Sequence, residues 1–124
     1  MIADYMDRGF LENIVDMFRH DRSLSPLIAD LMRDERMRVR LGISALVETL
    51  AEEDRASITN AIPGIVDLLR NENPTIRGDA AYLLGIIGHR DDLPFLRDAS
   101  GDENESVREI AREAIEQINN RGGA

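Results

Sequence analysis

Residues 63–88, PGIVDLLRNENPTIRGDAAYLLGIIG, decide the fold because their pattern recurs on both sides of them. Pro63 superimposes on Pro26 without a gap, and Pro94 begins a third copy. The copies start 37 and then 31 residues apart. Three copies are about the minimum for a solenoid, because each unit leaves apolar faces that only its neighbours can cover. The repeat therefore predicts a stacked helical array.

The second helix of each copy has five apolar positions at offsets of 0, 4, 7, 8 and 11, the spacing of one helical face. All fifteen positions are apolar in a chain that is 31% charged. They are Val39, Ile43, Leu46, Val47 and Leu50, then Ile76, Ala80, Leu83, Leu84 and Ile87, then Val107, Ala111, Ala114, Ile115 and Ile118. No alternating pattern is long enough for a strand, so we predict an all-α fold.

Helix-end signals agree with this register. Ser25 and Asn73 each stand where an N-terminal cap is expected, with a proline directly after each, and the Asn104-Glu105 pair puts an acid at the positive end of a further helix. Gly88 stands where a C-terminal glycine cap is expected.

An apolar stripe at helical spacing over residues 10–20 predicts one further helix ahead of the repeats. We therefore expect four segments. They are an N-terminal helix or cap over 1–23, a first repeat over 24–60, a second over 61–92, and a third with the C-terminal cap over 93–120.

The central copy closely resembles a HEAT-like repeat of the phycobilisome-lyase type. The residues that carry the resemblance are the run 63–77, the alanine and leucine pairs that follow, and Gly85 and Gly88. The other two copies depart from the pattern, with Glu48 and Glu116 where Gly85 stands. The resemblance covers roughly residues 24–118.

This resemblance implies a right-handed stack of antiparallel helix pairs whose second helices line the concave side. The fold class we expect is a short right-handed α-solenoid of about three helix pairs plus a leading N-terminal helix. Members of the family usually bind other proteins, and those named for lyase activity attach or detach bilin chromophores. A fold alone does not choose between these functions.

Composition excludes several classes of function. The formal charge of −9 repels phosphate backbones, so we expect no nucleic-acid partner. Absence of cysteine removes disulfides and thiolate sites. Because no apolar run is long enough to span a membrane and no secretory signal is visible, we expect a cytoplasmic protein with no membrane partner. All 15 basic residues are arginine, which fits either a salt-rich cytoplasm or a GC-rich genome.

The second-helix face opposite the apolar columns is the candidate partner-binding surface. Tyr82 is its most informative residue, because an aromatic ring with glycines one turn away on each side is a common interface anchor. The alternative is that the glycines serve helix packing and that Tyr82 lies over a neighbouring helix. The predicted partner-binding residues are Leu41, Ala45, Gly78, Tyr82, Ile86, Glu109, Glu113 and Glu116.

Glu109, Glu113 and Glu116 form an acidic ridge at helical spacing. As a binding site it would attract a basic protein or peptide, and salt would then weaken the complex. As a structural feature it would keep the outer face of a terminal repeat solvated.

A column of arginines recurs with acids five and ten residues before each one. Three aligned guanidinium groups would suit an anion, but the recurring acids favour a structural ladder of ion pairs between helices. The predicted ladder comprises Asp30, Glu35 and Arg40, then Asp67, Glu72 and Arg77, then Asp98, Glu103 and Arg108.

No arrangement of residues predicts catalysis. Neither His20 nor His89 stands in a context that suggests a base for a serine nucleophile, and a His-Asp-Asp cluster near His89 is a weak metal signal. Carboxylates on solvated helix faces have nothing to raise their pKa. We expect no enzyme, no cofactor and no metal.

The leading hypothesis is a non-catalytic module that binds a protein or peptide along its second-helix face. One alternative, from the family resemblance, is a lyase-like or chaperone subunit acting on a bilin-bearing or other tetrapyrrole-bearing protein. Another is a self-associating module in which Phe10, Phe18 or the second-helix face closes a homodimer.

Overall fold

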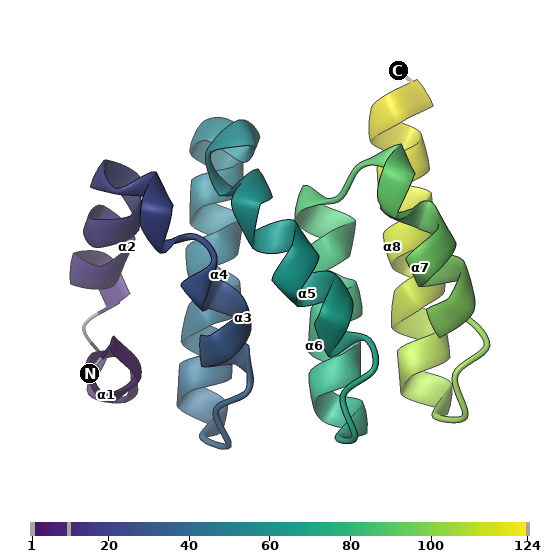
Figure 1. Ribbon diagram of the computed structural model, residues 1–124, viewed down its shortest axis with the longest axis horizontal. Coiled ribbons are helices and arrows are strands. Elements are labelled where there is room, and N and C mark those ends of the chain that lie inside the picture. The colour runs from purple at the N-terminus through teal and green to yellow at the C-terminus, as the bar shows by residue number, and fades with distance from the viewer. Residues whose placement is uncertain (1, 10, 124) are drawn as a thin grey trace. The chain divides into compact units, whose positions relative to one another are not determined.

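The computed structural model describes residues 2–9 and 11–123. Those residues form α-helices and short 3-10 helices and contain no strand (Figure 1). The all-α prediction is confirmed. Two compact units are present, unit 1 over residues 1–64 and unit 2 over residues 65–124. The boundaries proposed for the individual repeats stay predictions.

Unit 1 is built around the long helix α4 (Met37–Asp54). Three helices pack on it: α1 (Ile2–Asp7), α2 (Leu11–His20) and α3 (Leu27–Met32). The 3-10 helices η1 (Arg22–Leu24) and η2 (Arg55–Ala61) connect these elements, and α5 (Ile62–Leu68) begins at the end of the unit. All five apolar columns of α4 are buried, as predicted. Gly42 lets α1 come close, because a Cβ there would overlap the Met6 side chain.

Unit 2 is built around the contact between α6 (Pro74–Ile87) and α8 (Glu105–Gly123). The 3-10 helix η3 (Arg90–Asp92) leads into α7 (Leu93–Ala99), which packs along α8 (Figure 1). The predicted apolar columns of both second helices are buried except Ile115, which is half-buried.

Glycines set the distance between α6 and α8. A Cβ on Gly85 would lie 3.0 Å from both Cα and Cβ of Ala114, and one on Gly78 would lie 3.3 Å from Cδ1 of Ile110. Real Cβ atoms seldom make contacts this short, because they are closer than ordinary van der Waals distances. The two helices therefore approach through bare backbone at these positions.

The helix caps confirm one prediction from the sequence and differ from two others. Asn73 accepts from the N–H of Thr75, as predicted, and Asn104 likewise accepts from that of Val107. Ser25 is not the cap of α3: its hydroxyl donates to the carbonyl oxygen of Ser57. Gly88 does end α6, but its φ of −73° is not left-handed. The reason for glycine there is space, since a Cβ would lie 3.1 Å from Ile118.

Residues 10–20 confirm the predicted leading helix in the part that is described, which begins at Leu11. Phe10, proposed as a dimer contact, lies outside the described residues. Phe18, the other proposed contact, is buried in unit 1 and cannot serve on the surface. Among the described residues, no helix is both long and apolar enough to cross a membrane.

Candidate functional site

Two exposed stripes run along the second helices of unit 2. On α6 the stripe comprises Thr75, Asp79, Tyr82 and Ile86, and on α8 it comprises Ser106, Ile110, Glu113 and Gln117. Both follow the 4-3-4 spacing of one helical face, and every member is exposed or half-buried. Because α6 packs on α8, the stripes form one continuous surface, the α6–α8 surface.

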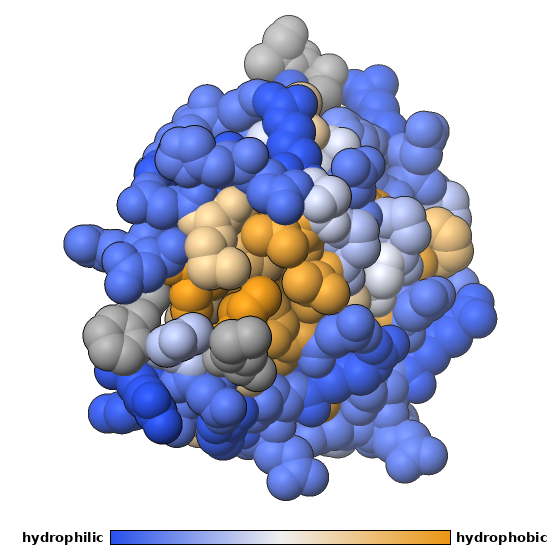
Figure 2. All heavy atoms as spheres, turned by 60° about the vertical axis from the view of Figure 1, so that its left-hand side comes forward, coloured by the Kyte–Doolittle hydropathy of each residue, from blue (hydrophilic) through white to orange (hydrophobic). Residues whose placement is uncertain are grey.

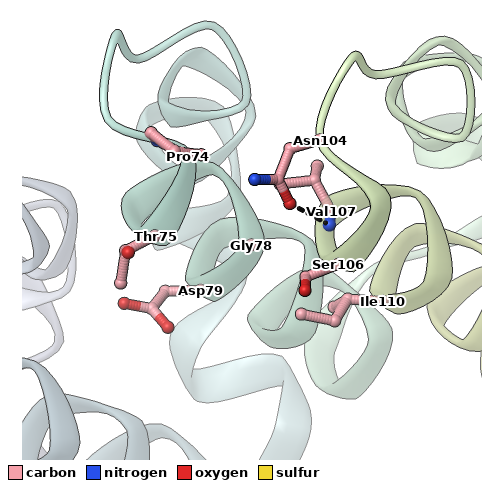
Figure 3. Close-up of a pocket in the computed structure, with 8 residues that line it drawn as sticks. All are labelled: Pro74, Thr75, Gly78, Asp79, Asn104, Ser106, Val107 and Ile110. Carbon is pink, nitrogen blue, oxygen red and sulfur yellow. Dashed lines mark hydrogen bonds between the residues drawn. The ribbon is translucent and has the colours of Figure 1, made fainter.

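A hollow of about 270 Å³ lies on this surface at the N-terminal ends of both helices. Figure 3 shows Thr75 and Asp79 on the α6 side and Ser106 and Ile110 on the α8 side. Gly78 contributes bare backbone between them. The hollow thus offers hydroxyls, one carboxylate and an apolar wall to an incoming side chain.

Tyr82 lies one turn beyond the hollow and is 42% exposed. The glycines on either side of it do not form a dip around its ring, which corrects the interpretation from the sequence. Gly78 and Gly85 are both buried and face α8, because a Cβ on either would meet side chains of that helix. Their role in helix packing is the alternative that the sequence left open.

The remaining predicted binding residues are distributed over both units. In unit 1, Leu41 is exposed and Ala45 half-buried on α4. In unit 2, Ile86 is half-buried and lies on the same stripe as Tyr82. The structure therefore presents the apolar candidates on two surfaces, one in each unit.

The acidic ridge of Glu109, Glu113 and Glu116 is exposed along α8. Among the described residues, none of these carboxylates forms an ion pair. Glu109 and Glu116 occupy the repeat columns of Gly78 and Gly85, the positions through which α6 packs on α8. Carboxylates in these columns are suited to solvent or to a basic partner, not to close packing of another helix.

The arginine column binds main-chain oxygens. Arg40 donates to the carbonyl oxygens of Asp34 and Glu35, at 2.8 and 2.9 Å. Arg77 repeats the pattern with Asn71 and Glu72. Arg108 donates to the carbonyl oxygen of Asp102 at 2.7 Å. Each arginine thus ties the start of a second helix to the turn that precedes it.

These contacts differ from the predicted carboxylate ladder. Glu35 and Glu72 contribute carbonyl oxygens, and Asp30 bonds to Arg33 on its own helix. Glu103 acts on Arg77 through its charge, which helps raise the pKa of that guanidinium. Asp67 and Asp98 are exposed. Each arginine instead donates to carbonyl oxygens of the turn directly before its own helix, five or six residues earlier in the chain.

An acid missed in the sequence, Asp102, completes the strongest of these contacts. Both its oxygens accept from Arg77, at 2.8 and 3.1 Å, and the two side chains are only 11% and 12% exposed. Hydrogen bonding from Arg77 lowers the pKa of Asp102. The sequence does contain a signal for Asp102, because it stands in a third repeat column with Asp34 and Asn71. The side chain of each of these residues accepts from the main-chain N–H two residues on.

Unit 1 contains a second, more exposed network. Arg36 binds Asp34 through two nitrogens and also pairs with Asp4 of α1. The side-chain hydrogen bond from Arg36 lowers the pKa of Asp34 to about 2, with the bond from its main-chain N–H acting in the same direction. The shift favours the ionised carboxylate, which is the opposite of what a general acid needs at neutral pH.

Neither histidine lies in a metal-binding cluster within the described part of the chain. His20 Nδ1 lies 2.7 Å from the carbonyl oxygen of Asp16, at the end of α2. His89 caps η3, with its main-chain N–H bonded to the Asp92 carboxylate. Both side chains thus have local roles at helix ends.

A model of the family described as HEAT repeats matches residues 24–116. The chain belongs to the HEAT repeat family. The match spans helices of both units, and it includes the three residues of the arginine column and every apolar column position except Ile118. HEAT repeats generally mediate protein–protein interaction and are typically non-catalytic. No curated protein and no solved structure matches this HEAT repeat chain.

Proposed function

We propose that this HEAT repeat protein is a non-catalytic module that binds a protein or peptide on the α6–α8 surface. The observation that carries the proposal is Tyr82, an aromatic side chain 42% exposed on a helix whose other large apolar residues are mostly buried. A tyrosine offers apolar area and one hydroxyl at low entropic cost, which suits an interface anchor. The hollow one turn away provides a recess for a neighbouring side chain of the partner.

The charge of this surface favours a basic partner. Glu113 lies on the α8 stripe itself, and Glu109 and Glu116 flank it on the same helix. The whole chain carries a formal charge of −9, so its field attracts cations over a distance of about one Debye length. Such charges contribute mainly to the association rate and to selectivity among partners.

Unit 1 offers a separate apolar contact for a partner. Leu41 is exposed and Ala45 half-buried on one face of α4. The sequence places both in the repeat columns that correspond to the partner-binding face. We include them in the proposed function as contacts made by the second helix of the first repeat.

The proposal assigns no catalytic step to the chain. The shifted carboxylates among the described residues, Asp4, Asp34, Glu53 and Asp102, all have their pKa lowered by arginine partners. Acid–base catalysis at neutral pH needs carboxyl groups shifted in the other direction. These pairs instead stabilise the fold.

The test begins with capture of partners from lysate of the source cells on the immobilised protein, at low and high salt. A captured protein is then purified and titrated into the isotope-labelled chain. We expect amide shifts to concentrate on the two stripes of the α6–α8 surface, and high salt to weaken the complex. Shifts confined to α5 and α7, or insensitivity to salt, would contradict the proposed surface or its preference for a basic partner.

A second candidate function is supported by residues 63–88, which resemble HEAT-like repeats of the phycobilisome-lyase type. It is a lyase-like or chaperone subunit that acts on a bilin-bearing protein. The two functions differ in one observable. Mixing the protein with a bilin and an acceptor protein changes the pigment spectrum in the second case and leaves it unchanged for a plain binding module.

A further inference from the structure

The hollow of the α6–α8 surface has a composition that suits one kind of side chain. Of the described residues that line it, only Asp79 is charged, and its side chain is half-buried. Thr75 and Ser106 bring a hydroxyl group each from the two sides of Gly78, and Ile110 provides an apolar wall (Figure 3). The lining thus combines one carboxylate, two hydroxyl groups and an apolar contact.

A charged lining distinguishes this hollow from the apolar one in unit 1. Figure 2 shows hydrophobic side chains gathered on the side that α1 and α2 form, among hydrophilic surroundings. The hollow on that side is lined by Tyr5, Asn13, Ile14 and Met17, none of which is charged. Its lining therefore selects no particular occupant, whereas the hollow on the α6–α8 surface selects by charge.

The hollow is not built for an anion, although α6 and α8 both begin beside it and helix N-termini commonly bind anions. The main-chain N–H of Thr75 donates to Asn73, and that of Val107 donates to Asn104. Pro74, the first residue of α6, has no N–H to offer. Donors that an anion would use are therefore taken or missing, and the carboxylate in the lining would repel it.

The arginines near these helix ends are bound elsewhere. Arg77 donates to the Asp102 carboxylate, and Arg108 donates to the carbonyl oxygen of the same residue. Glu105 and Glu109 are exposed at the start of α8, on either side of Ser106 in the sequence. Charge complementarity therefore favours a cation that the partner supplies.

We propose that the hollow binds an arginine side chain of the partner, an inference that rests on the proposed function of the α6–α8 surface. The guanidinium group donates to the Asp79 carboxylate and to the hydroxyl oxygens of Thr75 and Ser106. Its methylene groups lie along Ile110. Asp79 also takes part in another interaction within the chain, but a carboxylate has about four acceptor positions and can accept from a guanidinium group as well.

Two features favour arginine in a peptide over a free cation or a lysine. The acceptors lie on two helices, and the planar guanidinium group has five N–H donors to reach them, whereas an ammonium group is compact and more strongly hydrated. Asn104 turns its amide nitrogen toward α6 (Figure 3). That nitrogen can donate to a main-chain carbonyl oxygen of the same peptide.

Blocked single amino acids test the inference on the isotope-labelled chain at low ionic strength. N-acetyl-arginine amide should shift the amide signals of Thr75, Gly78 and Ser106 in a saturable way. N-acetyl-citrulline amide has nearly the same shape without the charge and should bind roughly fivefold more weakly, as for loss of one partly exposed ion pair. Equal binding of citrulline would overturn the role of charge, and equal or tighter binding of N-acetyl-lysine amide would overturn the assignment to arginine.

A matched pair of variants tests whether the hollow itself is responsible. Asp79→Asn keeps the shape of the side chain and should weaken binding of the arginine amide roughly fivefold. Asp98→Asn removes the same charge from an exposed position on α7 and should leave binding unchanged. Undiminished binding in Asp79→Asn, or an equal loss in both variants, would show only general attraction to an acidic chain. Amide signals away from the substituted residue establish that each variant is folded.

The outcomes separate this inference from the proposed function. A captured partner that shifts both stripes, while the arginine amide does not bind in the hollow, leaves the function in place and overturns the arginine site alone. Binding of the arginine amide in the hollow, with no captured partner that shifts the stripes, would overturn the function while the hollow keeps its class of ligand.

Discussion

Both units contain arginine–aspartate ion pairs, but the pairs differ in how far they are buried. In unit 1 Arg36 binds Asp34 and Asp4 with its own side chain 40% exposed. In unit 2 Arg77 binds Asp102 with both side chains nearly covered. Water screens the first network and leaves the second stronger, so similar bonds should contribute different free energies to folding.

Close helix packing differs between the units in a similar way. In unit 1 the atoms that crowd Gly42 belong to the flexible end of Met6. In unit 2 the atoms that crowd Gly85 include the main-chain Cα of Ala114. A flexible thioether can move aside, whereas a helix backbone moves only with its whole helix. Unit 2 should therefore tolerate substitution of its packing glycine less than unit 1 does.

The largest effect should come from Gly85→Ala. Its Cβ forces α8 outward, and we expect a loss of about 2 kcal/mol in the free energy of unfolding, even though alanine favours the helix. Gly42→Ala should change that free energy by less than about 1 kcal/mol, because Met6 can adopt another rotamer. Gly101→Ala, whose Cβ would make only ordinary contacts, is the control. Urea unfolding measures all three, and equal losses at Gly85 and Gly42 would remove the proposed difference between the units.

A somewhat smaller difference should separate Arg77→Ala from Arg36→Ala. Truncation of Arg77 removes the side-chain donor of Asp102 and the donor of two carbonyl oxygens in a covered site, and Asp102 keeps only the bond from the main-chain N–H of Asn104. Hydrogen bonds to charged groups contribute about 1.5 to 3 kcal/mol each, and we expect a loss near the lower end of that range. Arg36→Ala should cost clearly less, because Arg36 and its partner Asp4 are more exposed and water screens the pair. The reverse order in chemical denaturation would show that burial does not set the value of these pairs.

How far the sequence predicted the fold depends on which positions are considered. The apolar columns were predictable because a helix has a fixed period, and every one of them except Ile115 is buried. The sequence could not assign Gly78 and Gly85, since glycine fits both an open surface and a close contact. Which side of α6 meets α8 depends on how the helices stack, and residue spacing within one helix does not contain that information.

The arginine column shows a different limit. Recurrence identified Arg40, Arg77 and Arg108 as structural residues, but the bonds that they form go to main-chain oxygens, which have no sequence signature. Carboxylates are readily identified in a sequence as possible partners of arginine because they carry charge. Only a tight turn brings carbonyl oxygens within reach of each guanidinium group.

The smallest effect on stability should appear on acidification. Asp34 and Asp102 have lowered pKa values in the folded chain, so their contribution is complete above the unfolded value near 4 and is lost as pH falls towards the folded value, about 2 for Asp34. Allowing for water around Arg36, the Asp34 contribution is about 1 kcal/mol. Urea unfolding from pH 6 down to about 2 should show this loss, and Asp34→Asn should flatten the curve. An unchanged slope in that variant would indicate that the pair does not contribute.

The central claim is that the repeated columns hold the fold while Tyr82 binds the partner. It is tested most directly by measuring partner affinity and the free energy of unfolding on one preparation of Tyr82→Ala. We expect affinity to fall by roughly 30-fold, the equivalent of about 2 kcal/mol for an interface anchor, while the free energy of unfolding changes by less than about 1 kcal/mol. Loss of several kcal/mol in stability, with unchanged affinity of the folded fraction, would contradict the claim.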